Sequence, residues 1–314
     1  MNPTHVPEGT QPPEAPPAPS CYRHPQHETY IRCTRCERYI CPNCMHDAPV
    51  GYQCPECVRA GHQGMREART VFGARLIAVP VLTYVLIALN VLAYVLELAR
   101  PTTVDRFDNL GQGLLGPDGR AYLIQGSGAL PPGFHLAGIA HGEWYRLLTS
   151  AFLHEPPGQG FGVLHILLNM YSLWLFGRVM EVQLGRVRFL ALYLVSAVGG
   201  SVLGYLISPT EAALGASGAI FGLVGAYFLM TRRMHSDPLG GGRQLIGSVI
   251  WLVASAGITS WQGHLGGLLA GLLLGMAFVF APRRGRAVLQ VAAVLAVGAL
   301  LVVAVLTQTA TLTG

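Results

Sequence analysis

The sequence predicts an all-α polytopic membrane protein that is preceded by a small cysteine-rich domain. Of its 314 residues, 51% are hydrophobic and 12% are charged, whereas soluble chains carry about 25% charged residues. The apolar residues form long blocks from about residue 76 onward, near the length that crosses a bilayer. All seven cysteines lie between residues 21 and 57. Residues 1–20 are rich in proline without an apolar signal-peptide core, so we expect a disordered tail there.

The cysteines, together with one histidine, form four pairs with two residues between the partners. This spacing lets two side chains converge on one tetrahedral ion, and eight ligands make two four-coordinate sites. In a reducing compartment the pattern indicates metal rather than disulfides. We predict two zinc ions in residues 21–62, and few large apolar residues are present there to fold the segment without them. The predicted ligands are Cys21, His24, Cys33, Cys36, Cys41, Cys44, Cys54 and Cys57.

The order of these pairs resembles a B-box or RING-like cross-brace. That resemblance implies that the first and third pairs share one zinc and that the second and fourth share the other. Two consecutive zinc ribbons would group the pairs differently, and His27, His46 and His62 are competing ligands. Closed sites with full ligand sets are structural, so we interpret the module as a recruiting or regulatory surface for a protein partner. Its four arginines are ordinary for a small finger, so nucleic acid is not the expected partner: Arg23, Arg32, Arg35 and Arg38.

Hydropathy predicts seven membrane-spanning helices behind a basic linker, residues 63–75. The predicted spans are 76–98, 162–180, 188–207, 213–230, 245–258, 261–280 and 287–308. Glycines are frequent within them, which in lipid marks close contacts between helices.

The arginines predict the orientation of these helices. Loops 66–75, 177–188, 231–243 and 281–286 carry three arginines each, and they alternate along the chain. The opposite side has Arg100, Arg106, Arg120 and Arg146, all in one long segment. Positively charged loops stay inside, so we expect a cytoplasmic N-terminus and an external C-terminus, in what we interpret as a bacterial cell membrane.

Four polar residues are predicted to lie at similar depth near the outer ends of three helices: His165, Asn169, Ser217 and His264. Single polar residues in membrane helices commonly serve interhelical hydrogen bonds, but ionisable ones are functional candidates. Together these four meet the needs of acyl transfer. Ser217 would be a nucleophile and His264 its base, while His165 and Asn169 would donate to an oxyanion. No carboxylate is expected at this depth, so we predict a dyad.

The motifs around these residues resemble those of the rhomboid family of intramembrane serine proteases. "GASG" with Ser217 is similar to the family's nucleophile motif, "GHLGGLLAG" to its histidine helix, and "HILLNM" to its oxyanion pair. "EWYRLLTSAFLH" resembles the Trp–Arg loop motif, and "GRVMEVQLG" the turn after the second helix. The further motif residues are Trp144, Arg146, Glu181, Gly215, Gly218, Gly267 and Gly271. Gly263 stands where the family usually has alanine, and residues 154–165 are longer than usual.

The resemblance implies a six-helix protease bundle over residues 76–285. Residues 286–314, which hold the seventh helix that hydropathy predicts, lie outside the resemblance. It implies an endopeptidase that cleaves transmembrane or juxtamembrane segments of other membrane proteins without a catalytic cofactor. An inactive rhomboid-like adaptor for transmembrane clients is the alternative, and a transporter is a second one. Glu97 and Glu211 are expected near the outer surface. Four histidines are expected to be solvated: His135, His141, His154 and His235.

Overall fold

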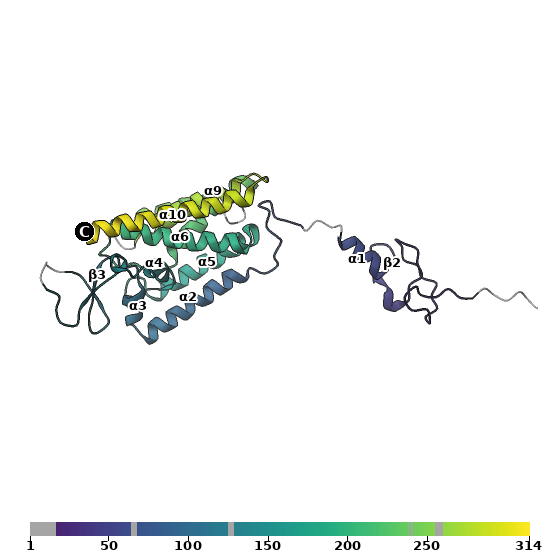
Figure 1. The fold of residues 1–314 in the computed structure, drawn as a ribbon, viewed down its shortest axis with the longest axis horizontal. Coiled ribbons are helices and arrows are strands. Elements are labelled where there is room, and N and C mark those ends of the chain that lie inside the picture. Colours follow the sequence, from purple (N-terminus) through teal and green to yellow (C-terminus); the bar gives the residue numbers. More distant parts are fainter. Residues whose placement is uncertain (1–16, 64–67, 125–128, 238, 240, 255–259) are drawn as a thin grey trace, which may run out of the picture. The chain divides into compact units, whose positions relative to one another are not determined.

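The computed structural model describes residues 17–63, 68–124, 129–237, 239, 241–254 and 260–314 (Figure 1). The chain divides into two compact units, residues 1–67 and residues 68–314. Three predicted features lie wholly or partly outside the described residues, namely most of the Pro-rich tail, Arg66 and the end of the span 245–258.

The N-terminal unit contains little regular secondary structure. Strands β1 (His46–Asp47) and β2 (Tyr52–Gln53) pair antiparallel, with His46 opposite Gln53. A 3-10 helix (Pro42–Cys44) precedes them, and α1 (Pro55–Gln63) follows. The buried cluster of this unit consists of six cysteines and Ile40. Such a core is too small to fold so short a segment without cross-links or metal.

The second unit is a helical bundle (Figure 1). Its long helices lie at the seven predicted positions: α2 (Val81–Ala99), α5 (Val163–Leu184), α6 (Arg186–Ile207), α7 (Ser217–Met234), α8 (Gly241–Ala254), α9 (Trp261–Phe280) and α10 (Arg286–Thr313). Among the described residues, five of them are long and apolar enough to cross a membrane, namely α2, α5, α6, α9 and α10. Helices α7 and α8 are shorter, with 18 and 14 residues. The predicted all-α membrane architecture is confirmed.

A folded segment connects α2 to α5. It contains α3 (Thr102–Phe107), the 3-10 helices Ile139–His141 and Ser150–Phe152, and α4 (Arg146–Thr149). Three short strands form one antiparallel sheet in the order β4-β3-β5: β3 (Gly113–Leu115), β4 (Ala121–Tyr122) and β5 (His135–Ala137).

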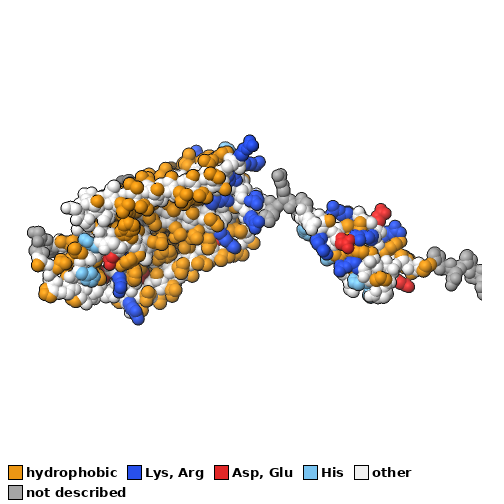
Figure 2. All heavy atoms as spheres, in the orientation of Figure 1, with side chains coloured by type: hydrophobic (Ala, Val, Ile, Leu, Met, Phe, Trp, Pro, Cys, Tyr) orange, Lys and Arg blue, Asp and Glu red, His pale blue; other side chains and the backbone are white. Residues whose placement is uncertain are grey.

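The core lies where α5, α6, α7 and α9 meet, and its fully buried side chains include Leu173, Tyr193, Tyr227 and Leu274. Helix α2 is fastened to α5 by buried Glu181, whose carboxylate accepts hydrogen bonds from the Leu82 and Thr83 amides. The face of the bundle that Figure 2 shows is mostly apolar, and many large apolar side chains of α2, α5 and α10 are exposed. This distribution suits a bundle whose solvent is lipid.

Helix α10 packs against α6. The Tyr205 hydroxyl lies 2.9 Å from the Thr309 hydroxyl at one end of this contact. Toward the start of α10, the Gln290 amide donates a hydrogen bond to the Phe278 carbonyl of α9. The predicted seventh helix is therefore an integrated part of the bundle.

Candidate active site

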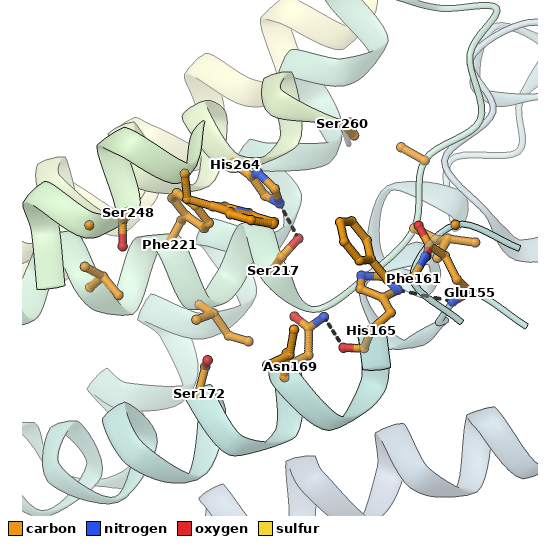
Figure 3. A pocket seen from close by; sticks show the side chains of 18 of the residues that line it. Glu155, Phe161, His165, Asn169, Ser172, Ser217, Phe221, Ser248, Ser260 and His264 are labelled. Carbon is orange, nitrogen blue, oxygen red and sulfur yellow. Dashed lines mark hydrogen bonds between the residues drawn. The ribbon is translucent and has the colours of Figure 1, made fainter. Parts of the chain in front are cut away.

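Ser217 is the first residue of α7, and His264 lies in the first turn of α9. Ser217 Oγ is 2.9 Å from His264 Nε2 (Figure 3). The helix predicted over 213–230 begins only at Ser217, because Gly215 has a φ of +123°, a conformation that glycine tolerates best. The Gly215 amide donates a hydrogen bond to the Ser150 carbonyl, which fixes this turn. The backbone therefore presents Ser217 at the first residue of the helix, where its side chain lines a cavity.

Glycines along α7 and α9 let the two helices approach until their backbones touch. A Cβ atom added at Gly267 would overlap the Gly218 carbonyl oxygen, and one at Gly271 would overlap that of Gly222. Small residues allow this close contact between membrane helices. The distance between the Ser217 and His264 side chains thus depends on main-chain packing.

The His264 ring is positioned by an aromatic neighbour. It stacks on Phe221, with ring centroids 4.4 Å apart and an angle of 5° between the planes. His264 is 6% exposed, and its Nδ1 has no hydrogen-bond partner among the described residues. Nothing in the sequence singles out Phe221, which lies four residues after Ser217 and so on the same helix face.

His165 and Asn169 project from α5 into the same pocket (Figure 3). His165 Nδ1 accepts a hydrogen bond from the Glu155 amide at 3.2 Å, so the ring proton resides on Nε2 in the neutral imidazole. His165 Nε2 lies close to Gly215, where a Cβ atom would come within 2.9 Å of it. The Asn169 amide donates to the His165 carbonyl at 2.9 Å, which leaves its second N–H for another acceptor.

These four side chains line a cavity of about 610 Å³. Its apolar wall includes Phe161, Phe176, Ile220, Val224 and Trp251. Ser172, Gln244 and Ser248 add polar groups to the wall. In Figure 3 the Ser172 and Ser248 hydroxyls point into the pocket, on the side away from Phe161 and Glu155. The cavity therefore places the Ser217–His264 pair among both apolar and polar side chains.

Contrary to expectation, His154 is buried, with no exposed surface. Its amide donates to the buried Glu97 carboxylate at 3.1 Å, and its ring lies beside the rings of Tyr94 and His165. The prediction of a solvated His154 was wrong because a carboxylate on α2 holds this loop inside the bundle. Glu97 therefore reaches the site indirectly, through His154 and His165. His135 and His235 are exposed and His141 is partly buried.

The Trp–Arg motif lies in the segment before α5. Arg146 is fully buried, and it forms ion pairs at 2.7 Å with Asp108 and with Glu143. Although burial alone would raise the pKa of Glu143, the Gly138 amide and Arg146 hold it below its usual value. Trp144 is 45% exposed and lines a separate apolar groove against α6 and α10. Through these ion pairs the buried Arg146 links Asp108, which directly follows α3, to Glu143 in the segment before α5.

The N-terminal unit brings the eight predicted ligands into two groups: Cys21, His24, Cys41 and Cys44, and Cys33, Cys36, Cys54 and Cys57. Within each group the ligand atoms lie within 4.8 Å of one another. Cys36 Sγ and Cys54 Sγ are 3.7 Å apart, close to the ~3.7 Å expected for two thiolates on one tetrahedral zinc. The grouping is that of the cross-brace and not that of consecutive ribbons. The sites could hold metal ions, and their sulfur and nitrogen donors fit zinc.

The fold and the site together define a polytopic membrane protein with a serine–histidine pair in an intramembrane cavity. The family model described as "Rhomboid domain" matches residues 141–281. The chain is 37% identical over 150 residues to "Putative rhomboid protease YdcA" of Bacillus subtilis (strain 168), covering 45% of this chain and 70% of that protein. It belongs to the rhomboid family.

Two further relatives are similar to nearly half of this chain. "Rhomboid protease GluP" of Bacillus subtilis (strain 168) is 37% identical over 169 residues, 49% of this chain and 31% of that protein. "RHOMBOID-like protein 1" of Arabidopsis thaliana is 37% identical over 149 residues, 46% of this chain and 36% of that protein. The chain thus spans about a third of the length of these two relatives.

Proposed function

We propose that this protein is an intramembrane serine endopeptidase that cleaves transmembrane or juxtamembrane segments of other membrane proteins. The observation that carries the proposal is the distance of 2.9 Å between Ser217 Oγ and His264 Nε2 inside a cavity of the bundle. A serine hydroxyl becomes an effective nucleophile when a base within hydrogen-bond reach accepts its proton. Membership of the rhomboid family and relatives named as rhomboid proteases support the same activity.

In the proposed reaction, Ser217 Oγ attacks the carbonyl carbon of the scissile peptide bond while His264 Nε2 takes the hydroxyl proton. Collapse of the tetrahedral intermediate breaks the C–N bond, and His264 returns the proton to the leaving amine. A water molecule then attacks the ester carbonyl carbon of the acyl-enzyme while His264 takes a proton from it. The ester C–O bond breaks, His264 returns that proton to Ser217 Oγ, and the new C-terminal carboxylic acid leaves. The polar groups of the cavity wall would let water reach this depth.

The developing oxyanion would be held by the Ser217 amide, His165 Nε2–H and the free N–H of Asn169. The α7 N-terminus adds the positive end of its helix dipole, and Ala216 at the N-cap makes no side-chain cap that would compete. Because the Glu155 amide occupies His165 Nδ1, the neutral ring is fixed as a donor toward the pocket.

An adaptor that binds transmembrane clients without cutting them is the second candidate. It would need the same cavity but would have no use for a serine within hydrogen-bond distance of a buried histidine. A transporter would instead use the polar side chains of the cavity wall as a path for its substrate. We favour the protease because only this reading uses the Ser217–His264 pair.

For the N-terminal unit we propose two structural zinc ions and a recruiting or regulatory role toward a protein partner. We further propose that the unit is cytoplasmic and that the C-terminus lies outside a bacterial cell membrane. Each full ligand set leaves no open coordination position for zinc-based catalysis.

A fluorophosphonate probe applied to the purified full-length protein tests the proposed chemistry. The wild type should label covalently at Ser217, and Ser217→Ala and His264→Ala should not. Ser248→Ala is a matched control, since Ser248 lines the same cavity without a histidine partner, and it should label like the wild type. Labelling that persists in the folded Ser217→Ala protein would refute the protease proposal, and absence of labelling in the folded wild type would favour the adaptor.

A further inference from the structure

Four arginines from three segments lie near one another at the end of the bundle where α6 and α10 begin. They are Arg188 on α6, Arg233 on α7, Arg283 before α10, and Arg286 at its first residue. Arg286 lies against the backbone of Gly73, where a Cβ atom would overlap its guanidinium. Arg188 donates a hydrogen bond to the neighbouring Phe72 carbonyl at 2.7 Å. Arginine side chains gather at this end of the unit in Figure 2.

The charges of this cluster are not balanced by the described part of the protein. The charged groups that act on Arg286 are Arg188, Arg233 and Arg283, all of them positive. No aspartate or glutamate among the described residues forms an ion pair with any of the four. Arg286 Nε is buried and has no hydrogen-bond partner there. The Arg286 side chain as a whole is only partly buried, but an unpartnered charged donor among like charges favours an anion.

Two helix N-termini add to the positive potential. Helices α6 and α10 start from Gly185 and Gly285, and neither start has a side-chain cap. The first amides of a helix lack intrahelical acceptors, and the helix dipole places partial positive charge beside them. Anions commonly bind at such ends.

The preference for arginine in inner loops explains why arginines lie at this end, but not why these four lie near one another. Other arginines of the same end have partners of their own. Arg178 stacks on Trp174 at 3.8 Å, Arg232 stacks on Phe228 at 4.9 Å, and Arg186 lies 3.8 Å from the Glu181 carboxylate. Within the cluster, Arg188 and Arg233 also donate to carbonyls, those of Phe72 and Val279. The cluster differs because Arg286 lies near enough to Arg188, Arg233 and Arg283 for their like charges to act on one another.

We propose that Arg188, Arg233, Arg283 and Arg286 form a binding site for a phosphate group at the membrane surface. Guanidinium groups match phosphate because they donate paired hydrogen bonds in a plane. The headgroup of an anionic phospholipid and free inorganic phosphate both present this chemistry. The site is remote from Ser217 in the fold, since it lies at the far ends of α7 and α9, and it does not depend on the proposed protease activity.

Native mass spectrometry of the full-length protein in mild detergent tests the site, with phosphatidylglycerol as the probe and phosphatidylcholine as the neutral comparison. We expect Arg286→Gln and Arg188→Gln each to weaken phosphatidylglycerol binding about tenfold. Arg284→Gln is the matched control, because Arg284 is exposed in the same loop and its replacement removes the same charge. It should change binding less than about twofold.

Thermal unfolding with millimolar inorganic phosphate, in detergent without anionic lipid, distinguishes the two sources. Stabilisation of the wild type but not of Arg286→Gln, without selective lipid binding, would assign the site to free phosphate. Equal losses in Arg286→Gln and Arg284→Gln would overturn the proposal, since they would indicate general attraction to a basic surface. Binding of neither probe would also overturn it. If Arg286→Gln does not fold, Arg188→Gln and Arg233→Gln provide the same comparison.

Discussion

The His264 ring lies flat against the Phe221 ring, with 4.4 Å between the centroids. An aromatic pair contributes about 0.5–1.5 kcal/mol beyond area burial, and here it restricts the orientation of the proposed base. We therefore expect Phe221→Leu to lower the cleavage rate of a model transmembrane substrate by about 2- to 10-fold. Phe221→Tyr keeps the ring and should retain most activity. A Phe221→Leu rate equal to that of the wild type would show that stacking does not position His264.

Asn169→Ala should leave partial activity. Removing one oxyanion donor typically costs about 10²–10³ in rate, and a partly wetted site should give a loss at the low end of that range. Cleavage assays should place this variant between the wild type and Ser217→Ala. Ser172→Ala, on the same helix and in the same cavity wall, serves as its control and should stay within about twofold of the wild type. Complete loss in a folded Asn169→Ala protein would mean that Asn169 does more than assist.

Gly267→Ala should destabilise the bundle and reduce activity, because its Cβ atom would overlap the Gly218 carbonyl oxygen. Overpacking of this kind costs about 1–3 kcal/mol. Gly298→Ala in α10 is the matched control, since a Cβ atom there meets nothing within 4 Å and alanine favours the helix. Thermal unfolding in detergent should show a lower midpoint for Gly267→Ala alone. Equal midpoints would contradict close contact of α7 and α9.

The full-length protein should contain two zinc ions per chain. Cys36→Ser removes one of four ligands of the second group, so zinc content measured by elemental analysis should fall to one or fewer. Cleavage of a model substrate should persist, because the membrane bundle forms a separate compact unit. A zinc content near zero in the wild type would contradict the metal assignment.

A C-terminal tag should be accessible from outside intact cells, and an N-terminal tag should not. The twelve arginines of the alternate inner loops, against four on the other side, support this orientation. Protease protection of the two tags provides the measurement. Protection of both would mean that α10 does not cross the membrane.

Polar residues in apolar helices were the informative signal in the sequence. Ser217, His264, His165 and Asn169 could be predicted to share a depth because they are rare among apolar neighbours, and the structure brings them to one cavity. Their catalytic roles stay predictions until tested. Phe221 gave no signal, since one more aromatic residue in a membrane helix is unremarkable in composition. The burial of His154 depends on Glu97, which is 57 positions away in the chain, and local pattern cannot reveal such a contact.

The cross-brace grouping of the zinc ligands was left open by spacing alone, because each pair could combine with either neighbour. It is decided by backbone contacts between distant segments. The Cys54 amide, for example, donates to Cys33 Sγ at 3.2 Å. Helix ends were also shifted from their predicted positions, most clearly at Ser217, where backbone conformation at Gly215 rather than hydropathy sets the start.

The glycine contacts between α7 and α9 have a consequence for how the protein can be altered. Since carbonyl oxygens and Cα atoms form this contact, repacking apolar side chains elsewhere in the core has little means of changing the spacing of Ser217 and His264. Helix α8, which contributes Gln244, Ser248 and Trp251 to the cavity wall, is not part of that contact. Substitutions that retune substrate preference should therefore be found among the large apolar side chains of the cavity wall on α8 and α5, such as Trp251 and Phe176, while the α7–α9 contact tolerates almost none.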